Sequence, residues 1–301
     1  MLSTSKLGVY VMDGTTGAQQ IALSGPQMLI AFDPQAHSSV LQLCRDFKSV
    51  YSAGLIVLHV FEGTQDLQYT TDDNPVDAAN DFWEQALASA LRALAPADQA
   101  LIDYVEGPCE FNNTPKISTY EVACWTGPFW FQLATLIADA GYKPVLGELP
   151  VGWLAIDNLD NLMPPLVPAL RTIRALGGAW SYHAYTIDYT TEVDIERWYS
   201  LRYRQMYTYL GQNFPDLADM PMFLTEAGVD ECGNPARSGW QDRGTAEDYK
   251  KWLVWFDSQI TRDPYITAAT IFQIGDSHWS SFNIEPIASW LASYLKETWT
   301  G

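Results

Sequence analysis

The sequence predicts a single (β/α)8 TIM barrel that spans residues 1–301. Short apolar runs rich in β-branched residues alternate strictly with longer segments of helical periodicity. About eight such units fit into 301 residues, which is close to the usual size of one barrel. No linker or low-complexity segment divides the chain. We therefore expect one domain.

The eight expected strands are almost continuously apolar, as parallel strands are when helices cover them. In chain order they cover residues 6–13, 27–33, 54–63, 100–113, 143–152, 179–186, 221–228 and 266–276. The fourth range includes the residues by which the chain leaves its strand. Parallel strands of a barrel present their carboxyl ends at one face, so the residues that end these runs are the candidates for chemistry.

Helical segments separate the strands and have apolar residues at helical spacing. They cover residues 37–53, 74–94, 117–141, 162–178, 194–212, 245–261 and 284–299. Ser38 or Ser39 would suit the N-cap of the first segment. A doubly wound sheet is the alternative fold, but it needs a glycine-rich phosphate turn after the first strand. The sequence DGTTGAQQ at 13–20 matches that turn poorly.

Composition excludes several function classes. Hydrophobic residues make up 48% of the chain and charged residues 18%, which is enough for a large core. The net charge of −19 argues against nucleic-acid and anionic-membrane partners. The first residues, MLSTSKLGVYVMDG, lack the pattern of a signal peptide. A cytoplasmic protein and a domain trimmed from a secreted protein both fit this observation.

The cysteines do not predict a metal or disulfide site. Cys44, Cys109, Cys124 and Cys232 are widely spaced, and no pair forms a CxxC motif. We expect free thiols, no zinc site and no cofactor. Twelve Trp and sixteen Tyr residues fit a carbohydrate site, because aromatic faces stack on sugars, but a large core would use them equally well.

Acidic residues gather at the expected carboxyl ends of the strands. The polar residues there are Asp13, Asp33, Glu62, Glu106, Glu110, Glu148, His183, Tyr185, Glu226 and Asp276. Such a ring disfavours a phosphate substrate and favours carboxylate catalysis or a divalent metal. Histidines and carboxylates are scattered without a known metal-ligand spacing. The sequence therefore predicts carboxylate catalysis and no metal.

Two of these carboxylates lie on different strands, as hydrolysis of a glycosidic bond requires. Glu110 follows the fourth strand, and Glu226 ends the apolar run PMFLTEAG of the seventh. One carboxyl must protonate the leaving oxygen, while the other attacks the sugar or activates water. Each glutamate could also be a solvated residue at a strand end. Glu106 is the alternative to Glu110 as the general acid.

Short motifs on the correct strands resemble those of clan A glycoside hydrolases. EGPCEFN at 106–112 resembles their E-x-x-N-E stretch, and FLTEAG at 223–228 resembles their nucleophile strand. SYHAY at 181–185 resembles the strand that carries a His and a Tyr beside the nucleophile. FQIGDSHW at 272–279 ends near a Trp, as the eighth strand of that clan often does.

The resemblance implies roles for individual residues. Glu110 matches the general acid/base, Glu226 the nucleophile, and Glu106 a residue that supports the strand end. Tyr185 would hydrogen-bond the nucleophile and orient it. His183 would line the sugar-binding cleft, and Trp279 would form an aromatic platform. By position alone, Glu148 and Trp153 are further candidates for the cleft lining. A place in the core is the alternative for His183, Trp279 and Trp153, and a solvent-facing place is the alternative for Glu148.

Two positions depart from the clan pattern. Cys109 stands where the family has an Asn that contacts the sugar 2-hydroxyl, and a thiol is a poor hydrogen-bond partner. The arginine common on the second strand is absent from LIAFDP at 29–34. Either the substrate lacks an ordinary 2-hydroxyl, another group makes the contact, or activity is low or lost.

These observations predict a retaining glycoside hydrolase that acts within a β-linked polysaccharide or a cell-wall glycan. An amino-sugar polymer would fit both the acidic residues at the expected carboxyl ends of the strands and Cys109. A catalytically silent glycan-binding barrel is the alternative in another class. A metal-dependent hydrolase is a third interpretation, and it predicts inactivation by a chelator. The sequence leaves the oligomeric state open.

Overall fold

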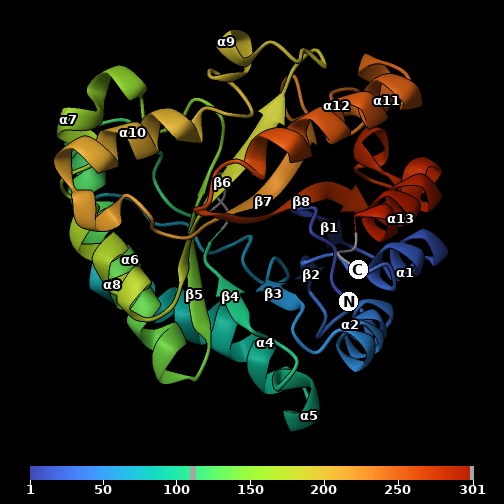
Figure 1. Ribbon diagram of the computed structural model, residues 1–301. Helices are drawn as coiled ribbons and strands as arrows, with labels where there is room; N and C mark the ends of the chain where they lie inside the picture. The colour runs from blue at the N-terminus through green and yellow to red at the C-terminus, as the bar shows by residue number, and fades with distance from the viewer. Residues whose placement is uncertain (109–112, 299–301) are drawn as a thin grey trace.

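The computed structural model describes residues 1–108 and 113–298 of the chain. Eight parallel strands close into a barrel in chain order, with β8 paired to β1 (Figure 1). The strands are β1 (Leu7–Val11), β2 (Met28–Phe32), β3 (Leu55–His59), β4 (Tyr104–Glu106), β5 (Lys143–Leu149), β6 (Ala179–Thr186), β7 (Met222–Val229) and β8 (Ile266–Ile274). The predicted (β/α)8 barrel is confirmed.

Helices surround the barrel and follow the strands along the chain (Figure 1). The α-helices are α1 (Thr16–Ala22), α2 (Ser38–Val50), α3 (Pro75–Phe82), α4 (Ala88–Ala93), α5 (Pro96–Gln99), α6 (Tyr120–Asp139), α7 (Leu159–Leu162), α8 (Val167–Ala175), α9 (Val193–Glu196), α10 (Tyr203–Asn213), α11 (Trp240–Arg243), α12 (Ala246–Ile260) and α13 (Ala288–Glu297). Single π or 3-10 turns are η1 (Trp83–Leu87), η2 (Ile156–Asn158), η3 (Pro215–Leu217), η4 (Ser280–Phe282) and η5 (Glu285–Ile287).

Alternating side chains divide the core into two layers. In β1, Val9 and Val11 pack in the outer cluster with residues of the surrounding helices, while Tyr10 belongs to the cluster inside the barrel. Phe223 and Phe272 join that inner cluster from β7 and β8. Both faces of the strands are therefore buried, which explains the continuous apolar runs.

The described ends of the chain lie side by side (Figure 1). Thr4 Oγ1 donates a hydrogen bond of 2.6 Å to the carbonyl of Thr298, so the first and last segments close the same part of the barrel. Among the described residues, no helix combines the length and hydropathy needed to cross a bilayer.

Tertiary contacts explain where the predicted elements were wrong. Helix α1 has no counterpart in the prediction, and it is short. It depends on a cap at Thr15, whose hydroxyl donates 2.6 Å to Glu285 Oε2 from the far end of the chain. Among its described residues, the expected strand at 100–113 is confined to the three residues of β4, because α5 and the turn after it occupy the residues up to Ile102.

Two helical predictions also need correction. The segment 194–212 is divided between α9 and α10. Neither serine is the N-cap of α2: His37 occupies that position and makes no side-chain cap hydrogen bond. Ser39 Oγ instead donates to the Asp13 carboxylate in the loop that follows β1. A tertiary partner therefore replaces the local cap.

Candidate active site

A cavity of about 840 Å³ lies at the carboxyl ends of the strands. Its wall is rich in aromatic residues: Tyr10, Phe32, Phe61, Tyr185, Tyr199, Phe272, Trp279 and Phe282. Its ionisable groups are Glu226, Asp230, Glu231, Asp276, Cys232, His59, His183 and His278. Within the described part of the chain, no Lys or Arg lines it. Aromatic faces with a few convergent polar groups suit an organic ligand, and the acidic lining disfavours an anionic one.

A β-bulge aims Glu226 into this cavity. The pairing of β6 with β7 joins Ser181 to Phe223 and then His183 to Glu226. One residue of β6 thus stands against two of β7, which is the definition of a bulge. Strand β7 continues through Glu226 to Val229, so Glu226 is not the first solvated residue beyond the strand. Its side chain is 17% exposed.

Two groups on β6 contact the Glu226 carboxylate. Tyr185 Oη donates a hydrogen bond of 2.7 Å to Glu226 Oε2. His183 Nδ1 lies 3.3 Å from the same oxygen. The bulge brings these three side chains together, because it sets His183 and Glu226 opposite one another in the sheet. The carboxylate is thereby held in one orientation toward the cavity.

The loop after β8 fixes the Trp279 ring in the wall. Asp276 accepts backbone N–H hydrogen bonds of 3.1 Å from both His278 and Trp279. Gln273 Nε2 donates 3.0 Å bonds to the carbonyls of Asp276 and Trp279. The Trp279 ring packs edge-on against Phe272 with centroids 5.4 Å apart. Trp279 is therefore a rigid, half-buried platform, and Asp276 shapes its loop.

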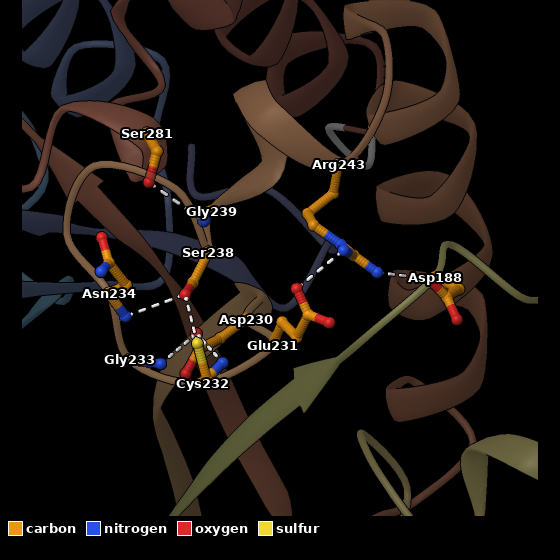
Figure 2. A network of polar contacts seen from close by, with 10 residues as sticks. All are labelled: Asp188, Asp230, Glu231, Cys232, Gly233, Asn234, Ser238, Gly239, Arg243 and Ser281. Carbon is orange, nitrogen blue, oxygen red and sulfur yellow. Dashed lines mark hydrogen bonds and ion pairs between the residues drawn. The ribbon is translucent and has the colours of Figure 1, made fainter.

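A network of polar contacts holds the loop after β7 at the rim (Figure 2). Asp230 Oδ1 accepts the backbone N–H groups of Cys232 and Gly233 at 3.1 and 2.7 Å. Arg243 binds Glu231 at 2.8 Å and Asp188 at 2.7 Å, so it ties this loop to the one after β6 (Figure 2). Burial raises the pKa of Asp230, and the charge of Glu226 adds to the shift.

A buried polar cluster forms the floor beneath the cavity. His59 ends β3, and its Nδ1 lies 3.0 Å from Glu106 Oε2 on β4 and 3.8 Å from Glu148 Oε1 on β5. All three residues are at most 3% exposed. Burial lowers the pKa of His59, but the hydrogen bond and charge of Glu106, together with the charges of Asp33 and Glu226, outweigh it and leave the pKa raised. Glu106 thus contacts another side chain instead of solvent.

The backbone of β5 turns Glu148 into this cluster. Gly147 has φ +137°, and a Cβ there would lie 2.5 Å from the Ser181 carbonyl oxygen, so only glycine fits. Glu148 has φ +41°, a conformation uncommon for residues with a Cβ. Its backbone N–H donates 2.7 Å to Ser181 Oγ. Residues with such uncommon backbone conformations concentrate at functional sites.

Some expected site residues lie elsewhere. Glu148 and Trp153 are buried and are not part of the cavity wall. The Trp153 carbonyl accepts a 2.7 Å hydrogen bond from Arg202 Nη1, so this residue connects the loop after β5 to the loop that precedes α10. Cys109 and Glu110 lie outside the described residues, so their roles stay predictions.

Sequence reasoning missed His59 and Asp230 at this site. His59 is hidden in the apolar run LIVLHVF, where only its position at the end of a strand could have indicated a role. Asp230 comes four residues after Glu226 and looks like part of a loop. The second strand carries no arginine at its end. Phe32 ends β2 instead, where it lines the cavity and stacks on His59.

Comparisons with known proteins agree with the fold. No protein-family model matches the chain, and no curated protein matches it. Among solved structures, the chain is similar to a GH5-4 broad specificity endoglucanase from an uncultured bacterium, with 12% identity, a TM-score of 0.51, and coverage of 94% of this chain and 84% of that one. It is also similar to a GH113 β-1,4-mannanase, with 11% identity, a TM-score of 0.50, and coverage of 97% and 99%. At these identities the similarity shows the TIM-barrel fold that such glycosidases have, and no individual family.

Proposed function

We propose that the chain is a retaining glycoside hydrolase that cleaves within β-linked glycans, with Glu226 as nucleophile and Glu110 as general acid/base. The observation that carries the proposal is the 2.7 Å hydrogen bond from Tyr185 to Glu226 inside an aromatic cavity at the carboxyl ends of the strands. A nucleophilic carboxylate must be oriented toward the sugar carbon, and a tyrosine that donates to one of its oxygens does this. The roles of His183 and Trp279 as cleft residues belong to the same proposal.

The reaction would proceed in two steps. Glu226 attacks the anomeric carbon while the bond to the leaving oxygen breaks, and Glu110 gives its proton to that oxygen. Glu110 then takes a proton from water, the water oxygen attacks the same carbon, and the bond to Glu226 breaks. Two inversions give net retention, and they require carboxyl groups about 5–5.5 Å apart. A separation of about 9 Å would instead leave room for a water and indicate inversion.

The cavity lining supports a neutral or amino-sugar substrate. Glu226, Asp230 and Asp276 line the cavity, and in its described lining Lys and Arg are absent. A sugar acid would meet like charge, whereas a neutral or cationic sugar would not. The rings of Trp279 and Phe61 offer stacking faces in the same wall. We infer a β-glucan, β-mannan or amino-sugar polymer as substrate class rather than a uronic-acid polymer.

The test compares the native chain with Glu226→Gln on a panel of glycans. The panel contains β-glucan, β-mannan, chitosan, peptidoglycan and polygalacturonate, and new reducing ends are measured. We expect turnover of at least one neutral or amino-sugar polymer and a loss of at least about 10⁴-fold in Glu226→Gln, which lacks the nucleophile. Glu231→Gln is the matched control, because Glu231 lines the same cavity and pairs with Arg243 at the rim. It should keep activity within a few-fold.

A silent glycan-binding barrel is the second candidate. The feature that favours it is Cys109, where the resembled clan has an asparagine that contacts the sugar. In that case the native chain would bind a glycan of the panel without releasing reducing ends, and Glu226→Gln would bind it equally well. Isothermal titration calorimetry on the native chain and the variant separates this outcome from hydrolysis.

A further inference from the structure

The floor cluster of His59, Glu106 and Glu148 has a geometry that hydrolysis by two carboxylates does not require. The three residues end or nearly end β3, β4 and β5, which are adjacent strands of the barrel. One nitrogen or oxygen of each residue lies within 4.8 Å of the others. The side chains are at most 4% exposed. The strand order has therefore gathered three potential metal ligands that are more than 40 residues apart in sequence.

The distances between these atoms suit a small metal ion. Bonds of about 2.0–2.1 Å to a tetrahedral centre put neighbouring ligand atoms about 3.3 Å apart. His59 Nδ1 is 3.0 Å from Glu106 Oε2 and 3.8 Å from Glu148 Oε1. Both distances differ from the tetrahedral value by about half an ångström or less. The carboxylate oxygens of Glu106 and Glu148 lie within 4.8 Å of each other, so side-chain rotations would bring the three ligand atoms around one ion.

The charge in the cluster also favours a cation. Two buried carboxylates face one imidazole, and a buried carboxylate is costly unless it is paired and hydrogen-bonded. Glu106 Oε1 is buried and has no hydrogen-bond partner among the described residues. The imidazole ring of His59 packs between two aromatic rings: it stacks on Phe32 with an interplanar angle of 14° and is tilted against Tyr10. A neutral imidazole with two carboxylates would balance the charge of a divalent ion.

We propose that His59 Nδ1, Glu106 and Glu148 form a binding site for a divalent first-row transition metal such as Zn²⁺. One imidazole and two carboxylates are ligands that Zn²⁺ and Mn²⁺ accept, and the soft thiolates that Cu⁺ prefers are absent from this set. Because His59 also lines the cavity, a fourth position would face the cavity. The metal would join the carboxyl ends of three strands. This proposal does not rest on the proposed hydrolase activity.

The test measures metal binding directly. The purified chain is stripped with a chelator, dialysed, and titrated with Zn²⁺ against a chromophoric competitor. We expect one equivalent to bind to the native chain. Glu106→Gln and Glu148→Gln should each weaken binding by more than the roughly 10- to 100-fold that is lost when a residue that only hydrogen-bonds a metal ligand is removed. Co²⁺ binding should give the intense visible absorption of a four-coordinate site, and that absorption should disappear in both variants.

Matched controls exclude binding elsewhere. Glu196→Gln changes another fully buried glutamate, which accepts from Thr186 and Ser200 away from the cluster. His278→Gln and Cys232→Ser remove potential ligands at the rim of the cavity. All three should keep the full affinity. Far-ultraviolet circular dichroism on each variant shows whether a loss of binding reflects a loss of fold.

Two outcomes would overturn the proposal. One is a native chain that takes up no Zn²⁺, Mn²⁺ or Co²⁺, which would mean that a protonated His59 bridges the carboxylates instead. The other is binding that survives Glu106→Gln and Glu148→Gln but disappears in a rim variant. If the cluster variants do not fold, anomalous diffraction at the zinc edge from native crystals decides, because a peak is expected between the three side chains. Glycan turnover is scored separately, so failure of either proposal leaves the other measurable.

Discussion

Removal of the Tyr185 hydroxyl tests how Glu226 is held. Tyr185→Phe deletes the 2.7 Å hydrogen bond to Glu226 Oε2 and leaves the ring in the wall of the cavity. A hydrogen bond to a charged group contributes about 1.5–3 kcal/mol. If that contribution acts fully in the transition state, kcat should fall by about 10- to 150-fold.

The assay is steady-state hydrolysis of whichever glycan of the panel the native chain cleaves. KM should change little, because the lost bond joins two protein groups and does not touch the sugar. Tyr199→Phe is the matched control, since Tyr199 also lines the cavity and its hydroxyl makes no hydrogen bond within the described part of the chain. Thermal unfolding checks that both variants keep the native fold.

A native kcat in Tyr185→Phe would refute the reasoning. It would mean that Glu226 needs no orientation by this hydroxyl, or that His183 Nδ1, 3.3 Å from the same oxygen, is sufficient. A large increase in KM at constant kcat would contradict it differently, because Tyr185 would then act as a substrate contact. Equal losses in Tyr185→Phe and Tyr199→Phe would indicate a general effect of hydroxyl removal in this cavity.

The remaining predictions concern the cavity wall and stability. Trp279→Ala should raise KM by about 2- to 12-fold with a smaller effect on kcat, because a stacking face contributes about 0.5–1.5 kcal/mol; an unchanged KM in the same hydrolysis assay would leave Trp279 a packing residue. Burial raises the pKa of Glu196 in the folded chain, so the folded state binds the proton more tightly than the unfolded state. Stability should therefore fall as pH rises from about 4.3 through the raised pKa. The free energy of unfolding, measured with urea between pH 4 and 7, should have a less negative slope against pH in Glu196→Gln than in the native chain. Identical slopes in the two proteins would contradict this.

Much of the fold follows from local pattern. The barrel strands lie in apolar runs of the sequence, and such runs can be recognised without any knowledge of the elements that pack against them. The errors arise where distant contacts decide. Helix α1 is stabilised by Glu285 from the last segment, which no window around Thr15 contains. The segment before β4 is taken by α5, whose Pro96 begins a new turn.

The candidate site divides in the same way. Glu226, His183 and Tyr185 could be named as candidates because they lie near the carboxyl ends of strands that carry recognisable motifs. Their mutual geometry could not, because it depends on a bulge that pairs His183 with Glu226. The direction of Glu148 depends on the positive φ at that residue and on Gly147. The cluster around His59 depends on three separate strands, and sequence spacing therefore gave no reason to expect a metal there.

Covalent trapping tests the central claim most directly. The native chain is incubated with activated 2-deoxy-2-fluoro β-glycosides that match the glycan it cleaves, and its peptides are mapped by mass spectrometry. A retaining mechanism predicts a stable fluoroglycosyl adduct on the peptide that contains Glu226, absent from Glu226→Gln. An adduct on another carboxylate such as Asp230, or turnover of the glycan with an inverted product and no adduct, would contradict the account.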